Sequence, residues 1–219
     1  MITMTEPQTF GNLFKLYCDK YRSLGQGSPR PKFPHSLSTQ EDTAARLAAH
    51  FALEIQSRGG TPDLDAPIAT IINDTARWMF DAGYRGLLLY GTLGNGKTTL
   101  LRALACVISS GRYLTAPRIY EDFKKNEALD YCRGQVLLID DLGAEPDCCI
   151  LYGEERYPLA DLLACRYDES MATVIATNLG FEKIKDRYGD RVYDRILETY
   201  YAIPFTAESF RLRKAKGEQ

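Results

Sequence analysis

The sequence predicts an α/β fold of three layers, with helices on both faces of a central parallel sheet. Short apolar runs alternate with stretches of helical periodicity, which is the pattern of parallel strands joined by helical crossovers. A glycine-rich segment lies between one apolar run and a helix, and a later apolar run ends in two aspartates. The 219 residues are long enough for one such domain with a small appendage.

The glycine-rich segment spans residues 86–100, GLLLYGTLGNGKTTL. It fits the pattern G-x-x-x-x-G-K-[ST] at its four fixed positions, Gly91, Gly96, Lys97 and Thr98. Residues 87–90 form an apolar run typical of a buried strand, and residues 99–109 have a helical pattern. Because strand and helix flank the loop, a P-loop is favoured over a glycine-containing turn that matches by chance.

A P-loop binds the phosphates of a nucleotide through backbone N–H groups and the positive end of the following helix. Lys97 would bring its charge to the β- and γ-phosphates, and Thr98 would place its hydroxyl on Mg²⁺. The predicted nucleotide-binding residues are Gly91, Gly94, Asn95, Gly96, Lys97, Thr98 and Thr99.

The chain before the P-loop divides into an extension and the start of the main domain. Prolines and glycines punctuate the first 36 residues, and the amphipathic segment 10–21 among them either packs on the domain or docks a partner. Ser38 or Thr39 would cap a helix that ends at two glycines, and a second helix is predicted over 65–80. We expect residues 1–60 to be the N-terminal extension and 61–219 the nucleotide-binding domain.

The chain after the P-loop helix continues the alternation of strands and helices. Strands are predicted over 112–116, 136–140 and 173–176, and helices over 119–126 and 157–167.

Polar residues follow two of these strands. Asp140 ends the run VLLID and is the natural Walker B acid that holds Mg²⁺ through its water shell. Asp141 comes next and would act as general base on an attacking water, although two turn-forming acids remain the alternative. Asn178 follows the strand in TVIATNL and could donate to the γ-phosphate or hold the water, but asparagine is also a common turn residue.

Taken together, these motifs resemble the helicase-loader and transposition-helper branch of the AAA+ ATPases, of the DnaC, DnaI and IstB type. The segments that carry the resemblance are GLLLYGTLGNGKTTL, VLLIDDLGAE, LADLLACRYDE, TVIATNL, RYGDRVYDRI and ESFR. The resemblance implies a three-layer P-loop NTPase of AAA+ type, with a short helical N-terminal extension and a vestigial lid. It also implies that the strand before Asn178 lies between the P-loop strand and the Asp140 strand.

The resemblance further implies roles for three arginines. Arg195 matches the arginine finger that reaches the ATP of a neighbouring subunit, and Arg191 is the alternative. Arg211 matches the sensor 2 position. Without the resemblance, Arg191 and Arg195 read as a salt-bridged helix surface, since they lie four residues apart beside two aspartates.

The function that the resemblance implies is ATP hydrolysis with Mg²⁺ by a DNA replication helicase loader. The partners would be single-stranded or duplex DNA, a replicative helicase and further copies of the chain when ATP is bound. The alternative is an IstB-type transposition helper, whose partner is a transposase. A small-molecule kinase would need a second substrate pocket, and intact Lys97, Asp140 and Asp141 argue against a scaffold that does not hydrolyse.

Composition limits the other possibilities. A net charge of −2 argues against a generally basic nucleic-acid coat, so DNA contacts would be local. The six cysteines include no C-x-x-C pair, and no apolar stretch has membrane-spanning length. We therefore expect a cytoplasmic protein without membrane contact.

Overall fold

The computed structural model describes residues 39–62, 64–80, 83–108, 110–126 and 130–205. Residues 31–219 belong to one compact unit. The predicted amphipathic segment 10–21, the chain beyond residue 205 with its predicted lid, and Arg211 lie outside the described residues.

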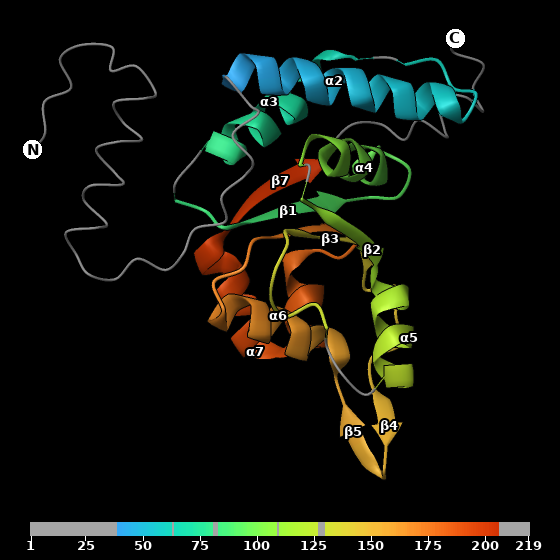
Figure 1. The fold of residues 1–219 in the computed structure, drawn as a ribbon, viewed down its shortest axis with the longest axis vertical. Helices are drawn as coiled ribbons and strands as arrows, with labels where there is room; N and C mark the ends of the chain where they lie inside the picture. The colour runs from blue at the N-terminus through green and yellow to red at the C-terminus, as the bar shows by residue number, and fades with distance from the viewer. Residues whose placement is uncertain (1–38, 63, 81–82, 109, 127–129, 206–219) are drawn as a thin grey trace, which may run out of the picture. The chain divides into compact units, whose positions relative to one another are not determined.

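Five parallel strands form the central sheet (Figure 1). They are β1 Gly86–Gly91, β2 Arg112–Thr115, β3 Leu137–Leu142, β6 Thr173–Thr177 and β7 Tyr200–Phe205, in the order β2-β3-β6-β1-β7. This order confirms the predicted parallel α/β fold. It also confirms that β6 lies between β1, which leads into the P-loop, and β3, which carries the acids.

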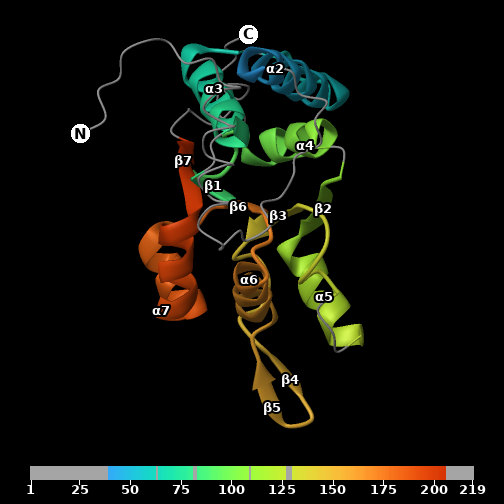
Figure 2. The ribbon, with the colours of Figure 1, turned by 60° about the vertical axis from the view of Figure 1, so that its left-hand side comes forward.

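Helices cover both faces of the sheet, as Figures 1 and 2 show. One face carries α2 Gln40–Ser57, α3 Ala66–Phe80 and α4 Lys97–Val107, and the other carries α5 Ala116–Asn126, α6 Pro158–Asp168 and α7 Phe181–Thr199. In β1, Leu87 and Leu89 pack into the core on the α2 side, and Leu88 packs on the α7 side. All three side chains are fully buried, which explains why β1 reads as a continuous apolar run instead of an alternating one.

Helix α2 begins where the sequence predicts. The Thr39 hydroxyl accepts a hydrogen bond of 3.0 Å from the backbone N–H of Asp42 and so caps the helix. Leu47 and Phe51 of α2 are buried in the core that also holds the P-loop helix α4. The domain boundary at residue 60 stays a prediction, and this packing favours a boundary before α2.

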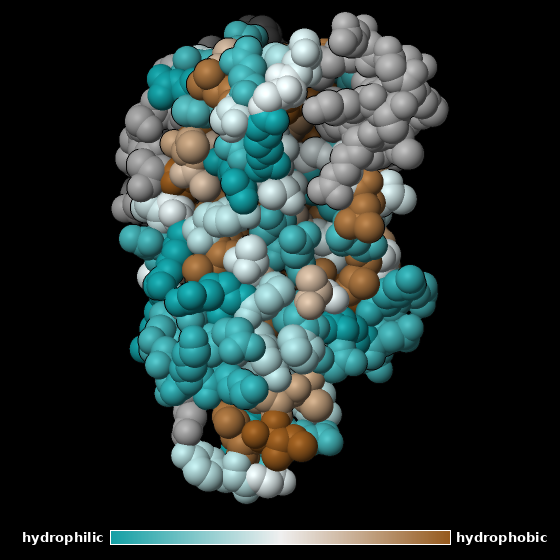
Figure 3. All heavy atoms as spheres, turned by 90° about the vertical axis from the view of Figure 1, so that its right-hand side faces the viewer, coloured by the Kyte–Doolittle hydropathy of each residue, from teal (hydrophilic) through white to brown (hydrophobic). Residues whose placement is uncertain are grey.

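Three strands have no counterpart in the sequence-based expectations. The edge strand β7 follows α7 directly, and its Pro204 is tolerated because an edge strand can leave one position without a ladder donor. Strands β4 Cys149–Leu151 and β5 Glu154–Arg156 form a separate antiparallel hairpin. Its Ile150 and Tyr152 are exposed. The hairpin lies at the bottom of Figure 1, and Figure 3 shows apolar side chains at that end of the molecule.

None of the described helices is both long and apolar enough to cross a membrane.

Arg166 of α6, from the RYD segment, is a structural residue. Its side chain is 1% exposed, and its guanidinium donates to the backbone carbonyls of Tyr131, Gln135 and Ala172 and to the Thr173 hydroxyl. Burial lowers the pKa of Arg166. The four bonds tie α6 to the loop before β3 and to the start of β6, which aligns the two strands that carry the predicted site.

Replacing Arg166 by alanine should lower the free energy of unfolding by about 3 kcal/mol or more, because several buried carbonyls lose their donors. Urea unfolding measures this change. Arg133→Ala is the matched control: Arg133 bonds Glu169 at 2.6 Å on the surface, and losing an exposed ion pair costs less than about 1 kcal/mol. Equal effects of the two substitutions would contradict the structural role of Arg166.

Candidate functional site

The P-loop joins the end of β1 to the start of α4. Gly91 has φ +143°, and a Cβ at this position would lie 2.5 Å from the carbonyl oxygen of Phe205 in β7. Gly96, the residue before α4, has φ +100°. Both conformations are difficult for residues with a side chain, and together they turn the loop so that α4 begins at Lys97. The first N–H groups of α4 therefore stand at the loop, where an anion can bind.

Lys97 is held over the loop by three acceptors. Its ammonium donates to the carbonyl oxygens of Gly91 at 2.8 Å and Thr92 at 2.6 Å, and to Oδ1 of Asn95 at 3.1 Å. Burial lowers the pKa of Lys97 to about 8, against the opposing effect of the negative charges of Asp141 and Asp140. The positive charge thus lies in a largely desolvated loop with neutral acceptors, and phosphate oxygens would be better partners for it.

Asp140 and Thr98 lie side by side across the sheet edge. The Thr98 hydroxyl donates to Oδ1 of Asp140 at 3.1 Å, and this carboxylate is only 2% exposed. Hard oxygen ligands of this kind suit Mg²⁺, which usually takes one or two protein ligands and fills its other positions with water and phosphate. The pair therefore fits the predicted metal site.

The two acids stand at a β-bulge. On β3, Ile139 pairs with Ile175 and Leu142 pairs with Thr177, so β3 has one residue more than β6 over this stretch. Asp141 has φ +53° and is exposed, whereas Asp140 is buried. The predicted strand ends at residue 140, but β3 continues to Leu142 and the bulge lies within it.

Asn178 stands between the P-loop and this bulge. Thr177, at the end of β6, is level with Tyr90 on one side and with Leu142 on the other. The next residue, Asn178, is exposed at the same edge. The sheet therefore brings Asn178 close to Tyr90, which precedes Gly91, and to Leu142, which follows Asp141.

Arg195 is held within its own chain. Its guanidinium donates to the carbonyl of Ala164 at 3.2 Å and to Asp168 at 2.7 Å, and it lies 4.4 Å from the centre of the Tyr167 ring. Its side chain is 14% exposed, whereas that of Arg191, one helical turn earlier in α7, is 74% exposed and lies 3.9 Å from Asp168. The finger role of Arg195 stays a prediction, and these contacts favour Arg191 instead.

A family model described as IstB-like ATP-binding protein matches residues 39–217. The chain belongs to this family. No curated protein matches the sequence. The match confirms the IstB part of the predicted resemblance and shows an ATP-binding protein.

Two solved structures illustrate the shared fold. A crystal structure of DnaI is 24% identical over 68% of this chain and 87% of its own, with a TM-score of 0.53. The AMPPCP-bound DnaA from Aquifex aeolicus is 19% identical over 72% of this chain and 52% of its own, with a TM-score of 0.50. At these identities the likeness shows the fold of the IstB-like chain and not its partners.

Two residues beside the P-loop and Asp140 make side-chain contacts that the sequence analysis did not predict. Asn95 is fully buried, and its amide donates to the carbonyl of Phe205 at 2.7 Å, so its side chain fixes the loop to β7. The Tyr113 hydroxyl donates to Oδ2 of Asp140 at 2.6 Å and holds the carboxylate from β2. Burial, and next the bond to Asp140, raise the pKa of Tyr113 to about 12. The one sequence signal for Tyr113 is its place in the predicted strand 112–116, which the structure pairs with the strand of Asp140.

The pKa of Lys97 makes ATP binding dependent on pH. Below about pH 8 the lysine is already charged in the free protein, so its protonation does not change when ATP binds. Above that pH the free protein loses the proton, and the phosphates must restore it. ATP affinity should therefore fall toward ~10-fold per pH unit above about pH 8, with uptake of up to about one proton.

Titration calorimetry in buffers of different ionisation enthalpy measures this proton uptake. Lys97→Arg is the control, because a guanidinium stays charged throughout this range, and its ATP affinity should lose the pH dependence. Proton uptake that is the same at about pH 7 and about pH 9 would contradict the lowered pKa of Lys97.

Proposed function

We propose that this IstB-like chain hydrolyses ATP with Mg²⁺, and that hydrolysis is switched on when copies of the chain assemble on DNA. One observation carries the proposal: the P-loop lysine, the Thr98–Asp140 pair, Asp141 and Asn178 occupy one edge of three neighbouring strands. A site that only held a nucleotide would not need an acid at a bulge beside a second polar residue.

Each residue at this edge has a part in the proposed reaction. Lys97 and the loop amides bind the phosphates, and Thr98 and Asp140 would hold Mg²⁺, which neutralises phosphate charge. Asp141, which is exposed at the bulge, would orient the attacking water and accept its proton, and the buried Asp140 is left to the metal. Asn178 supports the water or the γ-phosphate without competing for the metal.

The arginine that completes the site would come from a neighbouring copy. Arg195 is engaged with α6 of its own chain, whereas most of the Arg191 side chain is exposed. An arginine supplied in trans is worth ~10³–10⁵ in rate in GTPases. We therefore assign the trans arginine to Arg191 and a cis role, the joining of α6 and α7, to Arg195.

Arg191→Ala should leave ATP affinity unchanged and reduce hydrolysis at least ~100-fold, because the transition state loses a positive charge. Mixing this variant with Lys97→Ala should restore part of the activity. In a mixed assembly the Arg191→Ala copy supplies an intact P-loop, and the Lys97→Ala copy supplies the arginine. Steady-state phosphate release over a range of protein concentrations measures both effects.

Arg77→Ala serves as control for Arg191→Ala. Arg77 of α3 has a similarly exposed side chain and pairs with Asp74 at 3.3 Å on the opposite face of the sheet. A loss of turnover in Arg195→Ala but not in Arg191→Ala, with rescue by the Lys97→Ala variant, would return the finger role to Arg195.

Two partners are candidates for the assembled form. A replicative helicase fits the predicted loader, and a transposase is favoured by the family description, IstB-like ATP-binding protein. In both cases DNA would bind to the assembly, because the net charge of −2 leaves no excess of positive charge on one copy.

The ATPase rate with each partner separates the two candidates. A loader should be stimulated by single-stranded DNA together with a purified hexameric replicative helicase, and a transposition helper by duplex DNA together with a transposase from the same genome. DNA affinity should fall steeply with salt. A rate that responds to neither DNA nor either protein would refute an assembly factor while leaving ATP hydrolysis in place.

A further inference from the structure

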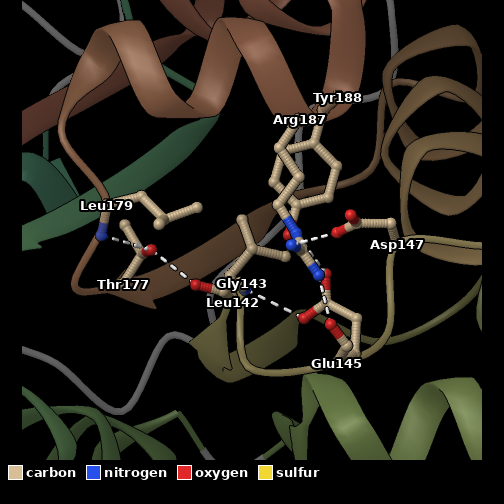
Figure 4. Close-up of polar contacts among 8 residues, drawn as sticks. All are labelled: Leu142, Gly143, Glu145, Asp147, Thr177, Leu179, Arg187 and Tyr188. Carbon is tan, nitrogen blue, oxygen red and sulfur yellow. Dashed lines mark hydrogen bonds and ion pairs between the residues drawn. The ribbon is translucent and has the colours of Figure 1, made fainter.

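A buried carboxylate lies just beyond the two acids. Glu145 is 4% exposed, and both of its oxygens are engaged. Oε2 accepts from the backbone N–H of Gly143 at 2.9 Å, and Oε1 accepts from the Tyr188 hydroxyl and from Nε of Arg187 at 3.4 Å (Figure 4). A carboxylate buried at this depth is tolerated only with such partners, so the contact is specific.

Arg187 strengthens the same contact from α7. Its guanidinium also donates to the backbone carbonyl of Glu145 and pairs with Asp147. With the bond to the Glu145 carboxylate, Arg187 therefore makes three contacts with the loop that follows β3, residues 143–147. We call the four residues Glu145, Asp147, Arg187 and Tyr188 the clasp. Figure 4 shows the Arg187 and Tyr188 side chains reaching from the helix to the loop.

The other side of this loop is held by the end of β6. The Thr177 hydroxyl donates to the carbonyl of Leu142 at 2.6 Å and accepts from the N–H of Leu179 at 3.0 Å. A Cβ on Gly143 would lie 2.6 Å from the Leu179 side chain, so the loop packs tightly there. The loop is thus fixed between β6 and α7.

The two residues that would face the water are both next to this fixed loop. Asp141 immediately precedes Leu142, and Asn178 lies between Thr177 and Leu179. Asp141 has φ +53°, a left-handed conformation that costs ~1–2 kcal/mol in a residue with a side chain. Such a conformation persists only where its surroundings enforce it.

The clasp also lies directly before a break in helix α7. Gly189 directly follows Tyr188 and breaks the helix with φ +82° and ψ +164°. Arg191 lies in the helical half that begins after this break. The clasp therefore fixes the first half of α7 to the loop that follows β3, and the second half of the helix begins directly after the clasp.

We propose that Glu145 and Arg187 are positioning residues for hydrolysis, which hold Asp141 opposite Asn178 from a distance. This inference rests on the proposed ATPase function. It excludes Glu145 as a general base, because both of its oxygens already accept hydrogen bonds in the interior. It also predicts a defect in turnover without a defect in nucleotide binding, since none of the hydrogen bonds and ion pairs described for the clasp reaches the P-loop.

The test compares kcat with ATP affinity and with ATP-binding stoichiometry. Arg187→Ala should reduce kcat by ~100-fold, as displacement of a reacting group by about 1 Å can do, while ATP affinity stays within about twofold. Tyr188→Phe removes one hydrogen bond and should reduce kcat by about tenfold. Arg187→Lys keeps the charge near Asp147 and Glu145 and should recover at least part of the activity that alanine loses.

A fluorescent ATP analogue measures the binding stoichiometry in the same samples. The positioning role predicts full stoichiometry with a reduced kcat per bound nucleotide, whereas a purely structural role predicts that stoichiometry and kcat fall in the same proportion. Arg133→Ala, which removes a surface ion pair away from the loop, should leave both unchanged.

The outcomes distinguish this inference from the function on which it rests. A wild-type assembly that binds ATP with DNA and does not hydrolyse it would refute the proposed function and the clasp together. A hydrolysing wild type whose kcat per bound nucleotide is unchanged in Arg187→Ala would overturn the clasp alone.

Discussion

The register of three neighbouring strands is the constraint on which the rest of the structure depends. β6 lies between β1 and β3, and Thr177 at its end is level with Tyr90 and Leu142. The extra residue in β3 then separates the two acids, so that one is buried beside Thr98 and the other is exposed. Without this bulge, successive side chains would point to opposite faces of the sheet, and only one acid could serve the site.

The sequence offers candidates for the site where the signal lies within a short segment. The P-loop pattern and the acid pair each lie within a few residues of an apolar run, so motif and context can be read together. By contrast, Tyr113 and Asp140 are 27 residues apart and meet only because their strands pair in parallel. Glu145 and Arg187 are 42 residues apart and meet only through the loop and α7. No periodicity in the sequence encodes such contacts.

The strand β7 was missed for a related reason. It follows α7 without a turn signal and contains Pro204, which argues against a central strand. Its position at the edge removes that objection, and its carbonyl at Phe205 receives the Asn95 amide of the P-loop. β7, which the sequence patterns do not predict, therefore holds the P-loop, which they predict clearly.

The nucleotide site is also connected to the helix that begins the described chain. Glu54 of α2 pairs with Arg102 of α4 at 3.1 Å, and the Arg102 guanidinium lies 5.5 Å from the centre of the Tyr113 ring. Tyr113 in turn holds Asp140. Glu54, Arg102 and Tyr113 thus form a continuous series of contacts from α2 to the carboxylate of Asp140.

The most direct test of the account is the structure of the assembled protein with Mg²⁺, DNA and a nonhydrolysable ATP analogue. The account predicts that Lys97 leaves the carbonyls of Gly91 and Thr92 for the phosphates, and that Asp141 and Asn178 face the γ-phosphate across a water. It further predicts that an arginine of a neighbouring copy enters the same space. A nucleotide bound with Lys97 still on those carbonyls, or with Asp141 turned away from the γ-phosphate, would contradict it.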